Sequence, residues 1–200
     1  MNSYPGIGAI VLAAGASTRL GQPKQLLPFR GKTLLQHALD EVAAVGLGEK
    51  VLVLGAHADV ILARTDAQGF HIAHNPDWTS GMAGSICTGL RLLQELAPAL
   101  AHVLILLSDQ PFVTRDLLDT LVQTQLRHGQ ITASRYAGRS AVPALFARPY
   151  FPALMHLRGD QGARQMFGQH PDAVFDVPFD MGTFDIDTPA DVDRLRRAGG

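Results

Sequence analysis

Short apolar segments alternate with amphipathic helical patterns along most of this chain, and this alternation limits its possible folds more than any other feature. Residues 9–13, 51–54 and 102–107 are short and almost wholly apolar, as expected of strands buried on both faces of a parallel sheet. Apolar residues at helical spacing predict helices over residues 34–45, 59–64, 84–96 and 114–127. The pattern predicts an α/β fold with a Rossmann-like, doubly wound and mostly parallel sheet that carries helices on both faces.

The alternation of apolar segments and helical patterns is less regular after Gly129, where prolines interrupt shorter apolar segments. Strands are expected over 131–134, 141–146, 174–177 and 184–186, and a helix over 149–157. Thr188 and Pro189 have the residue types preferred at the N-cap and the first position of a last helix. We expect these elements to extend the same sheet, so that residues 1–200 form a single domain.

The composition excludes several classes of protein. A net charge of -1 argues against a broad electrostatic interface with nucleic acid. No apolar run is long enough to span a bilayer, and the first residues lack the features of a signal peptide. The single cysteine, Cys87, excludes an intrachain disulfide, and we interpret it as a small core residue on a helix. We therefore expect a cytoplasmic protein with neither a nucleic-acid nor a membrane partner.

The first apolar segment ends abruptly in small residues, and two cations follow. Gly15 and its neighbours allow backbone N–H groups to approach a ligand closely, which makes a natural cradle for an anion. Pro23 disfavours helix at the residue before it, so Lys24 is expected on a loop. With Arg19 and Lys24 beside it, this cradle suits a polyphosphate. A plain strand-to-helix turn with two solvated charges is the alternative.

A carboxylate is expected opposite this loop. In an open α/β sheet, ligands bind beyond the carboxyl ends of the strands, where the strand order reverses. The strand over 102–107 is the best candidate neighbour for the first strand, and Asp109 lies two residues after its end. A carboxylate facing a polyphosphate requires a cation between them, and Mg²⁺ fits because it accepts one or two carboxylates together with phosphates and water. The alternative is that Asp109 only caps a turn before Pro111.

Asp185 and Asp187 are candidates for a second metal ligand. In an extended segment their side chains would share one face, and the residues alone do not distinguish between them. The histidines are scattered without the spacing of a zinc site, and no Gly-x-Ser-x-Gly elbow or P-loop is present. The residues alone therefore predict a nucleotide or phosphate site with a divalent metal.

The segment from Leu12 to Gly21, followed by Lys24, resembles the signature loop of nucleotidyltransferases related to molybdenum cofactor biosynthesis. Within that group it is most similar to the molybdenum cofactor cytidylyltransferase family. Further matches follow in the family's order: Asn75-Pro76-Asp77-Trp78, Gly81-Met82 with Gly84-Ser85, Asp109-Gln110-Pro111, Gly159-Asp160 with Gly162-Ala163-Arg164, and Asp185-Ile186-Asp187-Thr188-Pro189.

The resemblance implies Mg²⁺-dependent transfer of CMP from CTP to the terminal phosphate of molybdopterin, with release of pyrophosphate. It also implies a fold like that of the nucleotide-diphospho-sugar transferases, with a nucleotide-binding half over about 1–128 and an acceptor-side half over about 129–200. A small residue at Ala14, where guanylyl-transferring relatives typically carry glycine, favours cytosine. A molybdoenzyme or its maturation chaperone is the implied partner for the product.

The resemblance also assigns roles to individual residues. The implied nucleotide contacts are Leu12, Ala13, Ala14, Gly15, Arg19, Lys24, Gly84 and Ser85. The implied catalytic residues are Arg19, Lys24 and Asp109, and Asp109 would hold the metal with Asp187. The implied acceptor contacts are Gly159, Asp160 and Arg164.

One departure from the family pattern concerns the acceptor. Ala141-Val142-Pro143 replaces a turn of the Gly-His-Pro or Gly-Asn-Pro type, so the acceptor is less constrained than the nucleotide chemistry. Transfer with GTP, or to another phosphorylated acceptor, stays open. More distant alternatives are a glycosyltransferase that uses a nucleotide-sugar and a non-catalytic nucleotide-binding chaperone for the cofactor.

Overall fold

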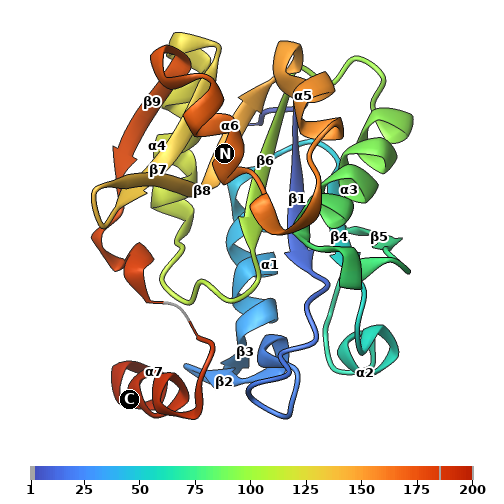
Figure 1. Ribbon diagram of the computed structural model, residues 1–200, viewed down its shortest axis with the longest axis vertical. Coiled ribbons are helices and arrows are strands. Elements are labelled where there is room, and N and C mark those ends of the chain that lie inside the picture. The colour runs from blue at the N-terminus through green and yellow to red at the C-terminus, as the bar shows by residue number, and fades with distance from the viewer. Residues whose placement is uncertain (1–2, 185, 200) are drawn as a thin grey trace.

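The computed structural model describes residues 3–184 and 186–199. Its main sheet has seven strands in the order β5-β4-β1-β6-β8-β7-β9 (Figure 1). The strands are β1 (Ile7–Ala13), β4 (Lys50–Leu54), β5 (His71–His74), β6 (His102–Leu107), β7 (Ile131–Tyr136), β8 (Arg139–Ala147) and β9 (Val174–Pro178). All pairings are parallel except those of β8, which runs antiparallel to β6 and β7. The predicted α/β fold with a mostly parallel sheet is confirmed.

Helices cover both faces of this sheet, as the alternation predicts. The helices of the described residues are α1 (Leu34–Val45), α2 (Ala58–Leu62), α3 (Met82–Leu96), α4 (Arg115–His128), α5 (Phe151–Met155), α6 (Arg164–Gln169) and α7 (Pro189–Gly199), and of these α7 packs away from the main sheet. The side chains of β1 alternate between the two faces: Val11 packs in the core beneath α1 and α4, whereas Ile10 and Leu12 pack in the core beneath α3, α5 and α6. Strands buried on both sides explain the nearly uninterrupted apolar runs of the sequence.

The strand order reverses at β1, and this reversal positions the site. The chain builds β4 and β5 on one side of β1 and then crosses to place β6 on the other side. The connections that leave the carboxyl ends of β1 and β6 therefore diverge and open a crevice between them, which is the usual ligand site of such sheets. The predicted neighbour relation between these two strands is confirmed.

β8 accommodates a proline inside the sheet. Its pairing with β7 is regular up to Ala133 opposite Ala144 and then shifts, so that Ser134 lies opposite Ala141. Val142 and Pro143 are the extra residues of this bulge, which is the place in a sheet where the missing N–H of proline is tolerated. The strand is therefore longer than the interrupted segment that the sequence predicts.

Two details of the prediction are wrong. Phe184 and Ile186 belong to no strand, and Asp185 lies outside the described residues. The side chains of Phe184 and Ile186 pack instead in a small third core with α7 and with β2 (Pro28–Phe29), which pairs with β3 (Lys32–Thr33). The helical spacing of apolar residues also predicts that Leu96 faces inward with Leu90 and Leu93, but Leu96 is the last residue of α3 and is 37% exposed.

The predicted helix starts are supported by capping contacts. Thr33 Oγ1 accepts a hydrogen bond from the N–H of Gln36 at 3.1 Å.

In the described part of the chain, no helix combines the length and the apolar character needed to cross a membrane.

Candidate active site

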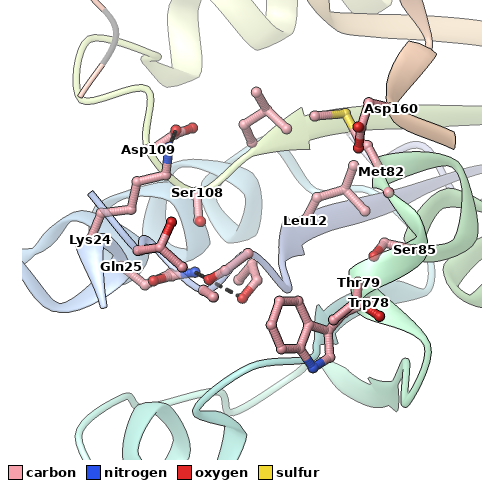
Figure 2. A pocket seen from close by; sticks show the side chains of 16 residues that line it. Leu12, Lys24, Gln25, Trp78, Thr79, Met82, Ser85, Ser108, Asp109 and Asp160 are labelled. Atoms are coloured by element: carbon pink, nitrogen blue, oxygen red, sulfur yellow. Dashed lines mark hydrogen bonds and ion pairs between the residues drawn. The ribbon is translucent and has the colours of Figure 1, made fainter. Parts of the chain in front are cut away.

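A pocket of about 380 Å³ opens at the crevice between β1 and β6 (Figure 2). Its walls come from the loop after β1, from the end of β6, and from the segment formed by the 3₁₀ turn η2 (Trp78–Ser80) and the start of α3. The predicted site residues that line it are Leu12, Ala13, Gly15, Lys24, Ser85, Asp109 and Asp160. Segments distant in sequence therefore meet where the topology predicts a ligand.

Lys24 is the electrostatic centre of this pocket. Its Nζ lies 2.6 Å from Asp109 Oδ2 and 2.9 Å from Asp187 Oδ1, so one ammonium group bridges both predicted metal ligands. The Lys24 side chain is 20% exposed and that of Asp109 is 15% exposed, whereas Asp187 lies at the solvent edge. Asp109 thus does more than cap a turn, and the sequence-based alternative of two solvated loop charges does not apply to Lys24.

The surroundings of Lys24 keep it charged. Burial by itself would lower the pKa of this ammonium, but the charges and hydrogen bonds of Asp109 and Asp187 outweigh that effect, and the pKa is raised. Lys24 therefore carries a full positive charge at neutral pH, in a site where water screens it only partly. Such a fixed cation can hold a phosphate group and stabilise charge on a leaving pyrophosphate.

The carboxylates Asp109 and Asp187 suit a divalent cation whose remaining coordination positions are filled by the substrate. Both carboxylates contact the Nζ atom of Lys24, so a single metal ion close to that position would be within reach of both. In residues 3–184 and 186–199, no group of three or more His, Cys, Asp or Glu side chains forms an all-protein metal cage. Mg²⁺ requires no such cage, because it takes one or two carboxylates together with phosphate oxygens and water. The donor set thus fits a nucleotide-bound Mg²⁺.

Gln25 organises the signature loop, a role that the sequence analysis did not find. Its side chain is 1% exposed, and its Nε2 donates to the carbonyls of Ala13 and Gly15, each at 3.0 Å. In a planar trans peptide the C=O and the next N–H point in opposite directions. Holding these carbonyls therefore turns the N–H groups of Ala14 and Ala16 away from Gln25, in the fixed orientation that an anion cradle requires. No sequence motif marks this glutamine beyond its place after Lys24.

We expect Gln25→Met to lower the free energy of unfolding by about 2 kcal/mol and to raise the KM for nucleotide severalfold. Methionine fills the same volume but leaves the Ala13 and Gly15 carbonyls without their donor. The checks are urea unfolding and initial rates over a range of nucleotide concentrations. Gln125→Met is the matched control, because Gln125 is also fully buried and donates to the Gln130 carbonyl at 2.9 Å outside the pocket. An equal rise in KM in both variants would contradict the role assigned to Gln25.

Arg19 lies in an adjoining hollow of about 290 Å³ that shares Thr18 and Lys24 with the main pocket. Asp187 also lines this hollow. The loop conformation is fixed by Ser17, whose Oγ accepts from the N–H of Lys24 at 3.0 Å. Lys24, expected on a loop, begins the short 3₁₀ turn η1 (Lys24–Leu26). The two predicted phosphate-binding cations thus lie in connected hollows.

A third hollow of about 210 Å³ adjoins the main pocket. It shares Met82, Leu107 and Asp160 with the main pocket. Two segments that the sequence analysis associated with the acceptor meet there: Ala141-Val142 from β8, and Gly162-Ala163-Arg164 before and within α6. Tyr136, the last residue of β7, and Arg139, the first residue of β8, also line it, and no sequence motif marks either residue.

Three predicted contacts line neither the main pocket nor the two hollows that adjoin it. The Ala14 carbonyl accepts from the N–H of Ala56 at 3.0 Å, and Ala14 is buried. Gly84 and Gly159 line a separate hollow on the other side of the η2–α3 segment. The roles assigned to these residues, including base choice by Ala14, stay predictions. Trp78, which belongs to one of the family matches but has no predicted role, is also on the wall of the main pocket.

The family model of the MobA-like NTP transferase domain matches residues 9–174, which include the loop, both cations and Asp109. The chain belongs to this family. The resemblance to nucleotidyltransferases of molybdenum cofactor biosynthesis is confirmed at this level, and the chain is a nucleotidyltransferase enzyme. The choice of CTP and of molybdopterin is a finer prediction.

Relatives of this MobA-like chain match it over nearly its whole length. Nicotine blue oxidoreductase from Paenarthrobacter nicotinovorans is 34% identical over 202 residues, covering 96% of this chain and 97% of the relative. Purine catabolism protein PucB from Bacillus subtilis (strain 168) is 32% identical, covering 97% of this chain and 98% of PucB.

A solved structure of a similar protein supports the same fold. Rv0371c from Mycobacterium tuberculosis H37Rv has a TM-score of 0.83 and 32% identity, covering 98% of this chain and 100% of that chain. Its complex with manganese has a TM-score of 0.81 and 30% identity, covering 96% of this chain and 98% of that chain.

Proposed function

We propose that this enzyme transfers CMP from CTP to the terminal phosphate of a molybdopterin-type acceptor and releases pyrophosphate. The observation that carries the proposal is the contact of Lys24 with both Asp109 and Asp187 at the strand-order reversal. A cation and two carboxylates at one point suit a metal-bound triphosphate, whose negative charge must be neutralised as it reacts. The family membership and the manganese complex of a similar structure agree with this.

In the proposed reaction, an oxygen of the acceptor phosphate attacks the α-phosphorus of CTP. The bond between the α-phosphorus and the oxygen that bridges to the β-phosphate breaks, and pyrophosphate leaves. The acceptor oxygen is already anionic near neutral pH, so no general base is required. Catalysis then depends on positioning and on electrostatic stabilisation.

The residues of the pocket divide this work. Lys24 and Arg19 would hold the triphosphate and offset the charge that grows on the leaving pyrophosphate. Asp109 and Asp187 would hold Mg²⁺, which when bound neutralises phosphate charge and polarises the phosphoryl oxygens. Arg139 and Arg164, on the third hollow, would attract the phosphate of the acceptor. Because that hollow shares Met82, Leu107 and Asp160 with the main pocket, acceptor and nucleotide would meet near Leu107.

The test is pyrophosphate release with Mg²⁺ and each of CTP, GTP, ATP and UTP, with and without molybdopterin. We expect release with CTP that requires molybdopterin. Release with GTP in place of CTP would contradict the base assignment, and release with another phosphorylated acceptor alone would contradict the acceptor assignment. The Paenarthrobacter relative is named as an oxidoreductase, so oxidation of the general hydride donors NADH and NADPH is followed in parallel. Hydride-donor oxidation without pyrophosphate release from any nucleotide would overturn the proposal.

A further inference from the structure

Trp78 is the only tryptophan of the chain, and it forms part of the wall of the main pocket (Figure 2). It begins the 3₁₀ turn η2 between β5 and α3, and its side chain is half-buried. The reaction as described above uses Lys24, Arg19 and the carboxylates but gives this indole no role. A large aromatic surface left partly open in a pocket wall calls for a ligand or for a packing explanation.

Packing explains only one end of the Trp78 side chain. A Cβ atom added at Gly55 would lie 2.6 Å from Trp78 Cβ and 2.8 Å from the Ala14 carbonyl oxygen, so the residue after β4 must be glycine. Ala14 is held in turn by the hydrogen bond from Ala56. The Cβ end of the Trp78 side chain is thus fixed against the end of β4 and the signature loop. Such a fixed ring is ready to bind a partner with little further loss of conformational entropy.

The pocket has a charged end around Lys24 and an opposite end whose side chains are uncharged apart from the exposed Asp160. Figure 2 shows Lys24 and Asp109 on one side and Trp78, Thr79 and Ser85 on the other. The hollow that contains Arg19 extends the charged end, because it shares Lys24. A nucleoside triphosphate is divided in the same way, with a polyanionic tail and an uncharged base that offers flat aromatic faces.

We propose that Trp78 is the platform on which the nucleobase packs. The inference rests on the proposed function for the presence of a nucleoside triphosphate, and it adds the residue that binds the base. Every base has an aromatic face, so this contact supplies affinity without choosing among bases. The choice of base then depends on polar groups at the same end of the pocket, such as the hydroxyl of Ser85, whose Oγ accepts from Asn75 Nδ2 at 3.0 Å.

The unmodified protein provides the first test, because its tryptophan emission comes from Trp78 alone. CTP with Mg²⁺ should change the emission in a saturable way. Inorganic tripolyphosphate with Mg²⁺, which offers the charged tail without a base, should protect the protein against thermal unfolding but leave the emission unchanged. A thermal shift with CTP and no change in emission would overturn the platform, as would equal changes with both ligands.

Variants provide the second test through steady-state pyrophosphate release. Trp78→Ala should raise the KM for CTP about tenfold with kcat within about twofold of the unmodified enzyme, since stacking on one aromatic ring contributes roughly a factor of that size. Trp78→Phe should restore most of the affinity. Phe175→Ala, which removes a half-buried aromatic that stacks on His128 outside the pocket, is the matched control and should leave KM unchanged. An unchanged KM in Trp78→Ala would overturn the inference.

The two proposals fail in different ways. A CTP-dependent change in emission without pyrophosphate release would support the platform and contradict the transfer reaction. Pyrophosphate release with unchanged emission and unchanged KM in Trp78→Ala would support the transfer and contradict the platform. Absence of both binding and release with all four nucleotides would contradict both.

Discussion

Replacing Lys24 with alanine is expected to reduce pyrophosphate release by about a thousandfold. The ammonium group contacts Asp109 and Asp187 and lines both the main pocket and the hollow of Arg19, so its removal takes the fixed cation from the place where charge develops. The two carboxylates would also be left without the group that neutralises them. We expect the loss mainly in kcat, measured in steady-state assays with saturating CTP and acceptor.

The chain offers a matched control for this variant. Lys32 also forms an ion pair, with Asp40, but its side chain is 54% exposed and it lies outside the three connected hollows. Lys32→Ala should retain full activity. Circular dichroism melting should show that Lys24→Ala is folded, with a loss of stability of about 1 kcal/mol. A folded Lys24→Ala enzyme with more than a tenth of the normal rate would refute the role assigned to Lys24.

Asp109→Asn is expected to be nearly as severe, with a loss of at least about a hundredfold in pyrophosphate release. The amide keeps the size of the side chain but removes the charge that would hold Mg²⁺ and that lies 2.6 Å from Lys24 Nζ. Because a metal ligand is affected, the concentration of Mg²⁺ needed for half-maximal activity should rise. The measurement is a titration of activity with Mg²⁺ at saturating CTP.

Two further variants show whether the effect belongs to Asp109. Asp119→Asn removes a carboxylate that pairs with Arg115 on the surface of α4, and it should change neither the rate nor the Mg²⁺ requirement. Asp187→Asn should give a smaller loss than Asp109→Asn, since Asp187 is 52% exposed and Asp109 is 15% exposed. An unaltered Mg²⁺ requirement in Asp109→Asn would argue that this carboxylate only positions Lys24.

The parts of the site that follow directly on buried strands could be predicted. The Ala9–Ala13 and His102–Leu107 runs are recognisable because strands covered on both faces exclude polar residues. Their ends place the signature loop and Asp109 at the same edge of the sheet by topology alone. The two strand ends therefore meet as predicted, and the loop and carboxylate face a common pocket.

Residues whose roles depend on side-chain direction could not be predicted in this way. Gln25 follows Lys24 directly, yet it turns inward to the loop carbonyls while Lys24 reaches the carboxylates. Trp78 belongs to a turn-like segment, and only the absence of a side chain at Gly55 lets its indole reach the pocket. Arg139 comes to the third hollow because β8 runs antiparallel between β6 and β7, an arrangement that no local sequence periodicity indicates.

The sequence by itself determined the α/β class, the strand-end loop with its two cations and the carboxylate across from it. These depend on local periodicity, on turn chemistry and on which residues follow a buried strand. The tertiary structure decided that Asp187, which is 163 residues from Lys24, completes the charged end, and that three hollows join into one site. The reason is physical: local patterns fix backbone conformation and burial, whereas contacts between distant side chains follow only from the packing of the whole chain.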